Sequence, residues 1–142
     1  MAEINLSRAR KIIRGIFAEG REKELKPLSV VVLDTGGNVK AFEREDGAAP
    51  GRFAVAHGKA YGTIMLGMAG TAQMARAEQQ AYFMDAANGL FDGQVVPVPG
   101  GVLVRDAKGN IVGAVGVTGD TSDNDAAAAI VGIEGATYTA EI

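Results

Sequence analysis

The sequence predicts an α+β fold in which helices pack on an antiparallel sheet, in the element order α-ββ-αα-ββ-α. Two strand–turn–strand patterns carry this prediction, because a tight turn joins its two strands as an antiparallel pair. Stretches with helical periodicity lie before, between and after these two patterns. We expect a single domain over residues 1–142, since domains of roughly 100–150 residues are common and no Ser- or Pro-rich linker divides the chain.

An amphipathic helix is predicted over residues 5–24. Its apolar side chains follow the spacing of one helical face, Asn5 is a suitable N-cap, and Pro27 prevents the helix from continuing. The two hairpins that follow later in the chain share the turn sequence Asp-x-x-Gly-Asn, which begins at Asp34 in the first and at Asp106 in the second. Because Asp and Gly-Asn are favoured turn residues, we interpret this similarity as turn chemistry rather than as a duplicated function.

Two helices are predicted between the hairpins, over residues 52–68 and 71–88, with Thr71 as the cap of the second and with Gly70 and Gly89 at their ends. The segment 91–101 carries two prolines, which allow only an edge strand or an extended loop. A last helix is predicted over residues 122–138.

Composition excludes several classes of site. The chain has 142 residues, no Cys, one His and a formal net charge of −3, which excludes disulfides, thiolate zinc sites and multi-histidine metal sites within one chain. No basic stripe predicts a nucleic-acid surface, and no apolar run predicts a membrane span or a signal peptide. We therefore expect a cytoplasmic protein that binds neither nucleic acid nor membranes.

The first candidate site is Arg44 with Asp46, near the end of the second predicted strand. Residues two apart on a strand share a face, so these two side chains could grip a polar ligand together. A surface ion pair before a turn explains them equally simply.

The second candidate is His57 with Lys59, on the helix that follows. His57 is the only imidazole in the chain, so acid–base chemistry near neutral pH, or nitrogen ligation of a metal, depends on this residue. The two residues lie about 200° apart around a helix and need not share a face. A solvated or structural role remains the simpler interpretation of each.

The third candidate is a glycine-rich strand end over residues 113–119 that leads into the last helix. Free backbone N–H groups near Gly116, Thr118 and Gly119 could hold an anion or a carboxylate. A capping box between Ser122 and Asp125 explains the same segment without a ligand. We predict no metal here, because the aspartates lack EF-hand spacing.

These segments together resemble the GlcG/HbpS-like family, also known as domain of unknown function 336. The matches run in the same order as in the family: its V-V-D-x-G-G turn over residues 31–37, its R-x-D-G-A over residues 44–48, its K-A at Lys59-Ala60, its G-G at Gly100-Gly101, its G-A-[IV]-G-V-[ST]-G over residues 113–119, and the acid of its last helix at Asp125. Two departures are the missing proline soon after Gly-Gly and the acidic Asp120. The resemblance implies a profilin-like fold and a homo-oligomer, from a dimer to an octamer.

The resemblance also suggests functions. The first is a small-molecule or cofactor-binding protein that takes haem or another tetrapyrrole, with Arg44, Arg52 or Lys59 neutralising its carboxylates and His57 or Thr118 approaching the metal. An alternative is a small catabolic lyase or isomerase for a carboxylated substrate, in which Arg44 or Lys59 clamps the carboxylate and His57 or Asp46 moves the proton. A third is a non-catalytic assembly protein. The residues alone leave open whether the protein is an enzyme.

Overall fold

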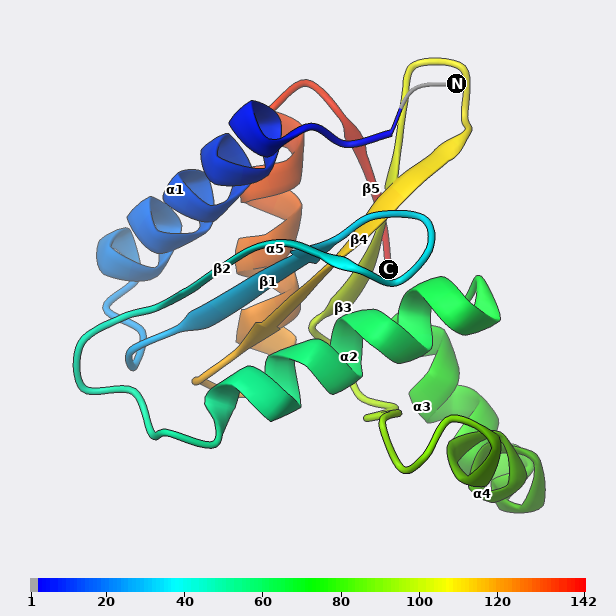
Figure 1. Cartoon of the computed structure of the whole chain (residues 1–142). Coiled ribbons are helices and arrows are strands. Elements are labelled where there is room, and N and C mark those ends of the chain that lie inside the picture. The colour runs from blue at the N-terminus through cyan, green and yellow to red at the C-terminus, as the bar shows by residue number, and fades with distance from the viewer. Residues whose placement is uncertain (1–2) are drawn as a thin grey trace.

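A five-stranded antiparallel sheet lies at the centre of the structure, a computed structural model that describes residues 3–142 (Figure 1). The strand order is β2-β1-β4-β3-β5. The strands are β1 (Ser29–Leu33), β2 (Val39–Arg44), β3 (Gly101–Arg105), β4 (Ile111–Thr118) and β5 (Thr139–Glu141). The helices are α1 (Leu6–Glu22), α2 (Arg52–Leu66), α3 (Gly70–Gln79), α4 (Ala81–Leu90) and α5 (Ser122–Gly135).

The sheet is covered on both faces. Helices α1 and α5 pack together on one face, and α2 crosses the other, while α3 and α4 extend away from the sheet (Figure 1). Alternate residues of β1 divide between the two layers, with Val30 and Val32 facing α1 and α5, and Val31 and Leu33 facing α2. Burial on both faces explains why this strand is apolar from Val30 to Leu33. The predicted α+β class is confirmed.

Local sequence signals account for the first helix and both hairpins. The Asn5 side chain caps α1 by accepting a hydrogen bond of 2.8 Å from the Arg8 amide. In the first turn, Asp34 Oδ1 accepts hydrogen bonds from two backbone amides within the turn, and Asp106 Oδ1 does the same in the second. The shared Asp-x-x-Gly-Asn sequence therefore acts as turn chemistry, as predicted.

The middle of the chain differs from prediction. The helix expected over residues 71–88 is broken at Gln80, where the backbone leaves the helical region and the chain continues as a separate helix, α4, in contact with α3. Thr71 is not a cap, because α3 begins one residue earlier with Ala69 at the N-cap. Helical periodicity is similar on both sides of one non-helical residue, so the pattern alone does not reveal the break.

The last helix is also shorter than expected. It ends at Gly135, and the chain turns at Thr137, which has a φ of 65°, to form β5. This strand pairs with β3 and covers an edge of the sheet. The proline-rich segment near residue 97 stays extended and forms no strand.

Glycines let α2 lie directly on the sheet. A β-carbon at Gly116 of β4 would overlap the carbonyl oxygen of Ala56, and one at Gly101 of β3 would overlap the carbonyl oxygen of Lys59. This close approach brings the polar side chains of α2 within reach of the end of β4.

Candidate functional site

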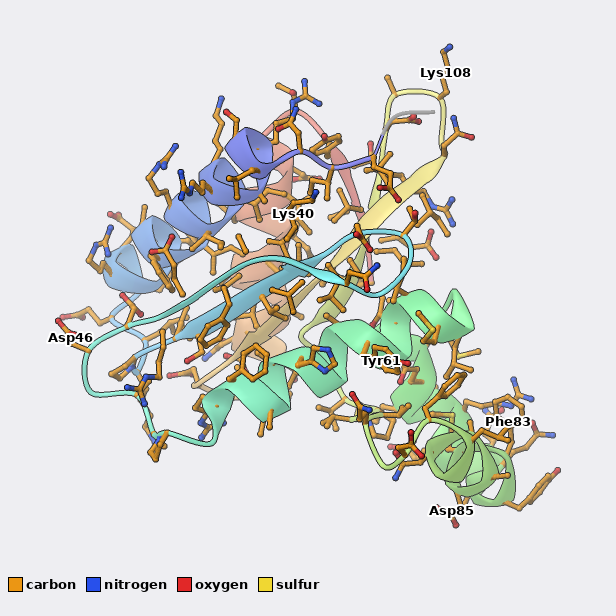
Figure 2. The ribbon with its side chains drawn as sticks, viewed as in Figure 1. Lys40, Asp46, Tyr61, Phe83, Asp85 and Lys108 are labelled. Carbon is orange, nitrogen blue, oxygen red and sulfur yellow. The ribbon has the colours of Figure 1, made fainter. Side chains whose placement is uncertain are left out.

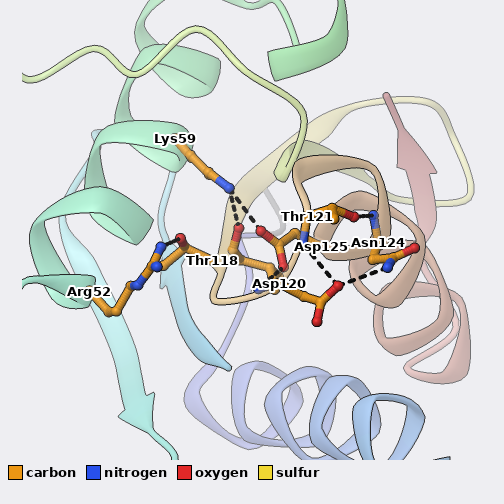
Figure 3. A network of polar contacts seen from close by, with 8 residues as sticks. Arg52, Lys59, Thr118, Asp120, Thr121, Asn124 and Asp125 are labelled. Atoms are coloured by element: carbon orange, nitrogen blue, oxygen red, sulfur yellow. Dashed lines mark hydrogen bonds and ion pairs between the residues drawn. The ribbon is translucent and has the colours of Figure 1, made fainter. Parts of the chain in front are cut away.

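A buried ion pair joins α2 to α5. The Nζ atom of Lys59 lies 3.1 Å from Asp125 Oδ2 and donates a second hydrogen bond of 2.9 Å to the carbonyl oxygen of Val117 (Figure 3). The Lys59 and Asp125 side chains are only 3% and 1% exposed. Burial lowers the pKa of Lys59 and raises that of Asp125, while the attraction between the two groups opposes both shifts.

A second carboxylate holds the loop before α5. The Asp120 amide donates to Asp125 Oδ1 at 3.0 Å, and the Asp120 carboxylate accepts hydrogen bonds from Asn124 Nδ2 and from the amides of Lys26 and Thr121. These donors, the Asn124 side chain first, lower the pKa of Asp120 to about 2. The Ser122–Asp125 capping box, one of the two interpretations of this segment, is wrong, because Thr121 is the N-cap and Asp125 points inward to Lys59.

The lowered pKa of Asp120 predicts a pH dependence. Stability from this carboxylate is fully present above the unfolded pKa of about 3.9 and is lost as the pH falls through the folded pKa, which is about 2. Replacing Asn124 with alanine removes the largest cause of the shift, so we expect the Asp120 pKa to rise. Carboxyl-carbon NMR titration of the wild type and Asn124→Ala measures the change, and an unaltered midpoint would contradict this assignment.

A separate hydrogen bond ties the start of α2 to the end of β4. Arg52 donates from its guanidinium to Thr118 Oγ1 at 2.7 Å (Figure 3). Close backbone packing accounts for the two predicted glycines nearby: a β-carbon at Gly116 would overlap α2, and Gly119 has a φ of +144° with the Pro27 carbonyl oxygen beside it. Five of the predicted site residues therefore lie together at one end of the sheet: Arg52, Lys59, Gly116, Thr118 and Gly119.

His57 lies on another face of α2 and does not join this network. Its ring stacks on Tyr61 with centroids 5.3 Å apart and lies 5.7 Å from the ring of Phe53. Phe42 of β2 meets Phe53 edge-on at 4.8 Å, and Phe91 meets Tyr61 at 6.0 Å. We call these five residues the aromatic stripe. Partial burial there lowers the pKa of His57, which favours the neutral imidazole at pH 7.

Arg44 and Asp46 do not share a strand face, contrary to prediction. Strand β2 ends at Arg44, and Asp46 lies in the exposed turn that follows, at the outer edge of the molecule (Figure 2). Both residues line an open cavity of about 460 Å³ between this turn and the end of α1.

The sequence carries a local signal for the aromatic stripe but none for the buried ion pair. Phe53, His57 and Tyr61 are spaced four residues apart, which places their side chains on one helical face. The Lys59–Asp125 pair had no such local signal, since the two residues are separated by 66 positions.

Residues 3–142 contain neither a membrane-spanning helix nor a cluster of metal-binding side chains. None of their helices is both long enough and apolar enough to cross a membrane. Within the same range, no three His, Asp or Glu side chains are grouped so that they could hold a metal ion.

The structure is that of a small α+β protein in which α2 packs closely on the sheet over glycines. The buried lysine–aspartate pair and the polar groups around it lie at one end of the sheet. The chain belongs to the HbpS-like family: the model of this family, described as "Haem degrading protein HbpS-like", matches residues 4–134. This confirms the resemblance seen in the sequence motifs.

Known relatives match most of the chain, in sequence or in fold. An uncharacterized 15.0 kDa protein of the dhaT-dhaS intergenic region in Citrobacter freundii is 30% identical over 125 residues, which cover 88% of this chain and 86% of that protein. The structure of a PduOC:heme complex matches with a TM-score of 0.87 at 17% identity, covering 99% of this chain and 100% of that one. A double mutant of HbpS from Streptomyces reticuli matches with a TM-score of 0.79 at 26% identity, covering 94% and 87%.

Proposed function

We propose that this protein binds haem or a similar tetrapyrrole on the aromatic stripe, with His57 as the ligand of the iron. The observation that carries the proposal is the position of the only histidine, which stacks on Tyr61 and lies beside the tilted ring of Phe53. Haem iron in proteins is commonly held by a histidine, and a tetrapyrrole presents large apolar faces to its pocket.

The chemistry of the stripe fits such a group. Iron ligation needs the neutral imidazole, and burial lowers the pKa of His57 in the required direction. The Phe53 side chain is 41% exposed, so a flat ligand can cover apolar surface there. Thr118 is a weaker candidate ligand, because it is 1% exposed and its oxygen already accepts the Arg52 hydrogen bond. The heme complex of PduOC supports the choice of ligand by relationship.

Hemin titration followed by absorbance tests this proposal. We expect a saturable, red-shifted Soret band in the wild type, and we expect His57→Ala to change the spectrum and weaken binding by roughly tenfold or more. Thr118→Ala tests the other candidate ligand and should leave the position of the Soret band unchanged. A non-saturating rise that resembles free hemin, or identical spectra for wild type and His57→Ala, would refute the assignment.

A lyase or isomerase acting on a carboxylated substrate is the second candidate. The specific observation in its favour is the lowered pKa of Lys59 beside Asp125, since burial prepares lysines for proton transfer. The pair is nearly sealed from solvent, however, and lines neither the cavity near Asp46 nor a smaller one beside α4. We therefore rank binding above catalysis, and turnover of small hydroxy acids or aromatic acids that Lys59→Met abolishes would reverse this order.

We also propose that the protein forms a homo-oligomer. Two large apolar side chains of α4 support this proposal, because Tyr82 is 72% and Leu90 is 80% exposed on a helix that extends from the sheet (Figure 1). Exposed apolar residues on one projecting element are typical of contact surfaces. Sedimentation of the hemin-loaded protein gives both the subunit number and the hemin stoichiometry.

A further inference from the structure

Three polar residues lie side by side across neighbouring strands. Ser29 of β1 is directly opposite Arg44 of β2 on one side and Thr118 of β4 on the other. Residues opposite one another in antiparallel strands share a face of the sheet. Because Val31, two positions after Ser29, belongs to the same buried cluster as Ala56, this row lies on the face that α2 covers. Arg44, on the edge strand, also lines the cavity beside the end of α1.

The hydroxyl of Ser29 has no hydrogen-bond partner among the described residues. Ser29 is 0% exposed, and its Oγ atom is one of two buried side-chain atoms in residues 3–142 that remain unpaired. Buried polar atoms are nearly always satisfied, so an unpaired one calls for an explanation. The opposite residue, Thr118, meets the guanidinium of Arg52, so the unpaired hydroxyl lies beside the first turn of α2.

Two guanidinium groups near this corner have no close counter-charge within the described part of the chain. Within residues 3–142, neither Arg44 nor Arg52 has a carboxylate within 4.0 Å, whereas Lys59 is paired with Asp125. The first turn of α2 adds unpaired backbone N–H groups, because its N-cap residue Gly51 has no side chain to accept from them. Glu43 and Glu45 flank Arg44 in the sequence and line the same cavity with it, and Glu45 lies 3.6 Å from Arg21.

We propose that Arg52, Arg44 and the hydroxyl of Ser29 form a carboxylate subsite. Guanidinium groups bind carboxylates through paired, charge-assisted hydrogen bonds, and the Ser29 hydroxyl supplies a further donor. When the ligand binds, Arg52 gives up its hydrogen bond to Thr118 and donates to the carboxylate of the ligand instead. No covalent bond forms or breaks.

The subsite restricts the class of ligand that the aromatic stripe can bind. In this respect the inference rests on the proposed function. Phe42 precedes Arg44 by two residues on the same face of β2, and Phe53 directly follows Arg52. The rings of Phe42 and Phe53 are in contact at 4.8 Å, so the stripe begins where the arginines lie. The ligand is therefore a flat, apolar molecule with a carboxylate at one edge.

Comparison of hemin with hemin dimethyl ester tests the subsite, because the ester keeps the macrocycle and iron but lacks both carboxylates. We expect Arg52→Gln and Arg44→Gln each to weaken hemin binding by roughly tenfold and to leave ester binding unchanged. The matched control is Arg14→Gln, which removes the same charge from an exposed position on α1. Equal losses for hemin and ester, or no loss for hemin, would overturn the subsite.

Ser29→Ala separates a ligand role from a structural one. The wild-type hydroxyl is unpaired, so its removal should leave the melting temperature of the free protein unchanged or raise it. If the hydroxyl binds the carboxylate, the same variant weakens hemin binding while ester binding stays constant. A lower melting temperature together with unchanged hemin affinity would assign Ser29 to the fold.

If neither hemin nor its ester binds, the proposed function fails and benzoate becomes the probe of the subsite. Saturable shifts of the Ser29, Arg52 and Thr118 amide signals with benzoate, lost in Arg52→Gln, would support the subsite alone. Unchanged amide signals up to millimolar benzoate would overturn it as well.

Discussion

Asp125→Ala is expected to lower the free energy of unfolding by about 3–5 kcal/mol, because it leaves a buried ammonium without its counter-charge. The Lys59 and Asp125 side chains are 3% and 1% exposed, and their charged atoms lie 3.1 Å apart. In the variant, Lys59 Nζ keeps only its hydrogen bond to the Val117 carbonyl oxygen. Urea denaturation monitored by circular dichroism measures the loss.

A matched substitution in the same helix controls for helix effects. Asp123 is also an acid in the first turn of α5, but it is exposed, so Asp123→Ala should cost less than about 1 kcal/mol. Equal losses for Asp123→Ala and Asp125→Ala would show that the buried pair contributes little to stability.

A double-mutant cycle then separates the pair from its surroundings. Replacing both partners, as in Lys59→Met with Asp125→Leu, removes the two charges together and leaves neither unpaired. We expect the double variant to be more stable than the sum of the single losses predicts, since residues in direct contact are not additive. Additive losses would mean that each side chain acts independently of the other.

The parts of this fold that were predictable from sequence are the local ones. Asn5 caps its own helix, and Asp34 and Asp106 each bind amides within four residues, so the relevant physics is contained in a short window of sequence. The break at Gln80 and the strand β5 depend on packing against segments elsewhere in the chain. Neither has a distinctive local pattern.

The candidate site shows the same difference between local features, which the sequence predicts, and features that depend on the assembled fold. Arg52, Lys59 and Thr118 are separate candidates in the sequence, and the structure brings them together at a glycine-rich strand end. Their roles stay predictions. The row that includes Ser29 depends on the register of three strands, and a shift of one residue would turn every side chain to the other face. Such a juxtaposition is a property of the assembled sheet and cannot be found in any segment alone.

Gly116→Ala is expected to destabilise the protein by about 3 kcal/mol, at the upper end of the usual cost of overpacking. Its β-carbon would overlap the backbone carbonyl of Ala56 and approach the Ala60 side chain. A backbone group cannot rotate away as a flexible side chain can, so α2 itself must move from the sheet. Because Arg52 and Lys59 are carried by α2, we also expect hemin binding to weaken.

Gly89→Ala adds the same methyl group where the structure has room for it. No atom lies within 4 Å of the added β-carbon, and Gly89 lies within α4, where alanine is the better helix former by about 1 kcal/mol. Urea denaturation should therefore shift in opposite directions for the two variants, and hemin binding should change only for Gly116→Ala. Equal stability of the two variants would mean that α2 can move away from β4 without cost. The close contact between helix and sheet would then not determine the positions of Arg52 and Lys59.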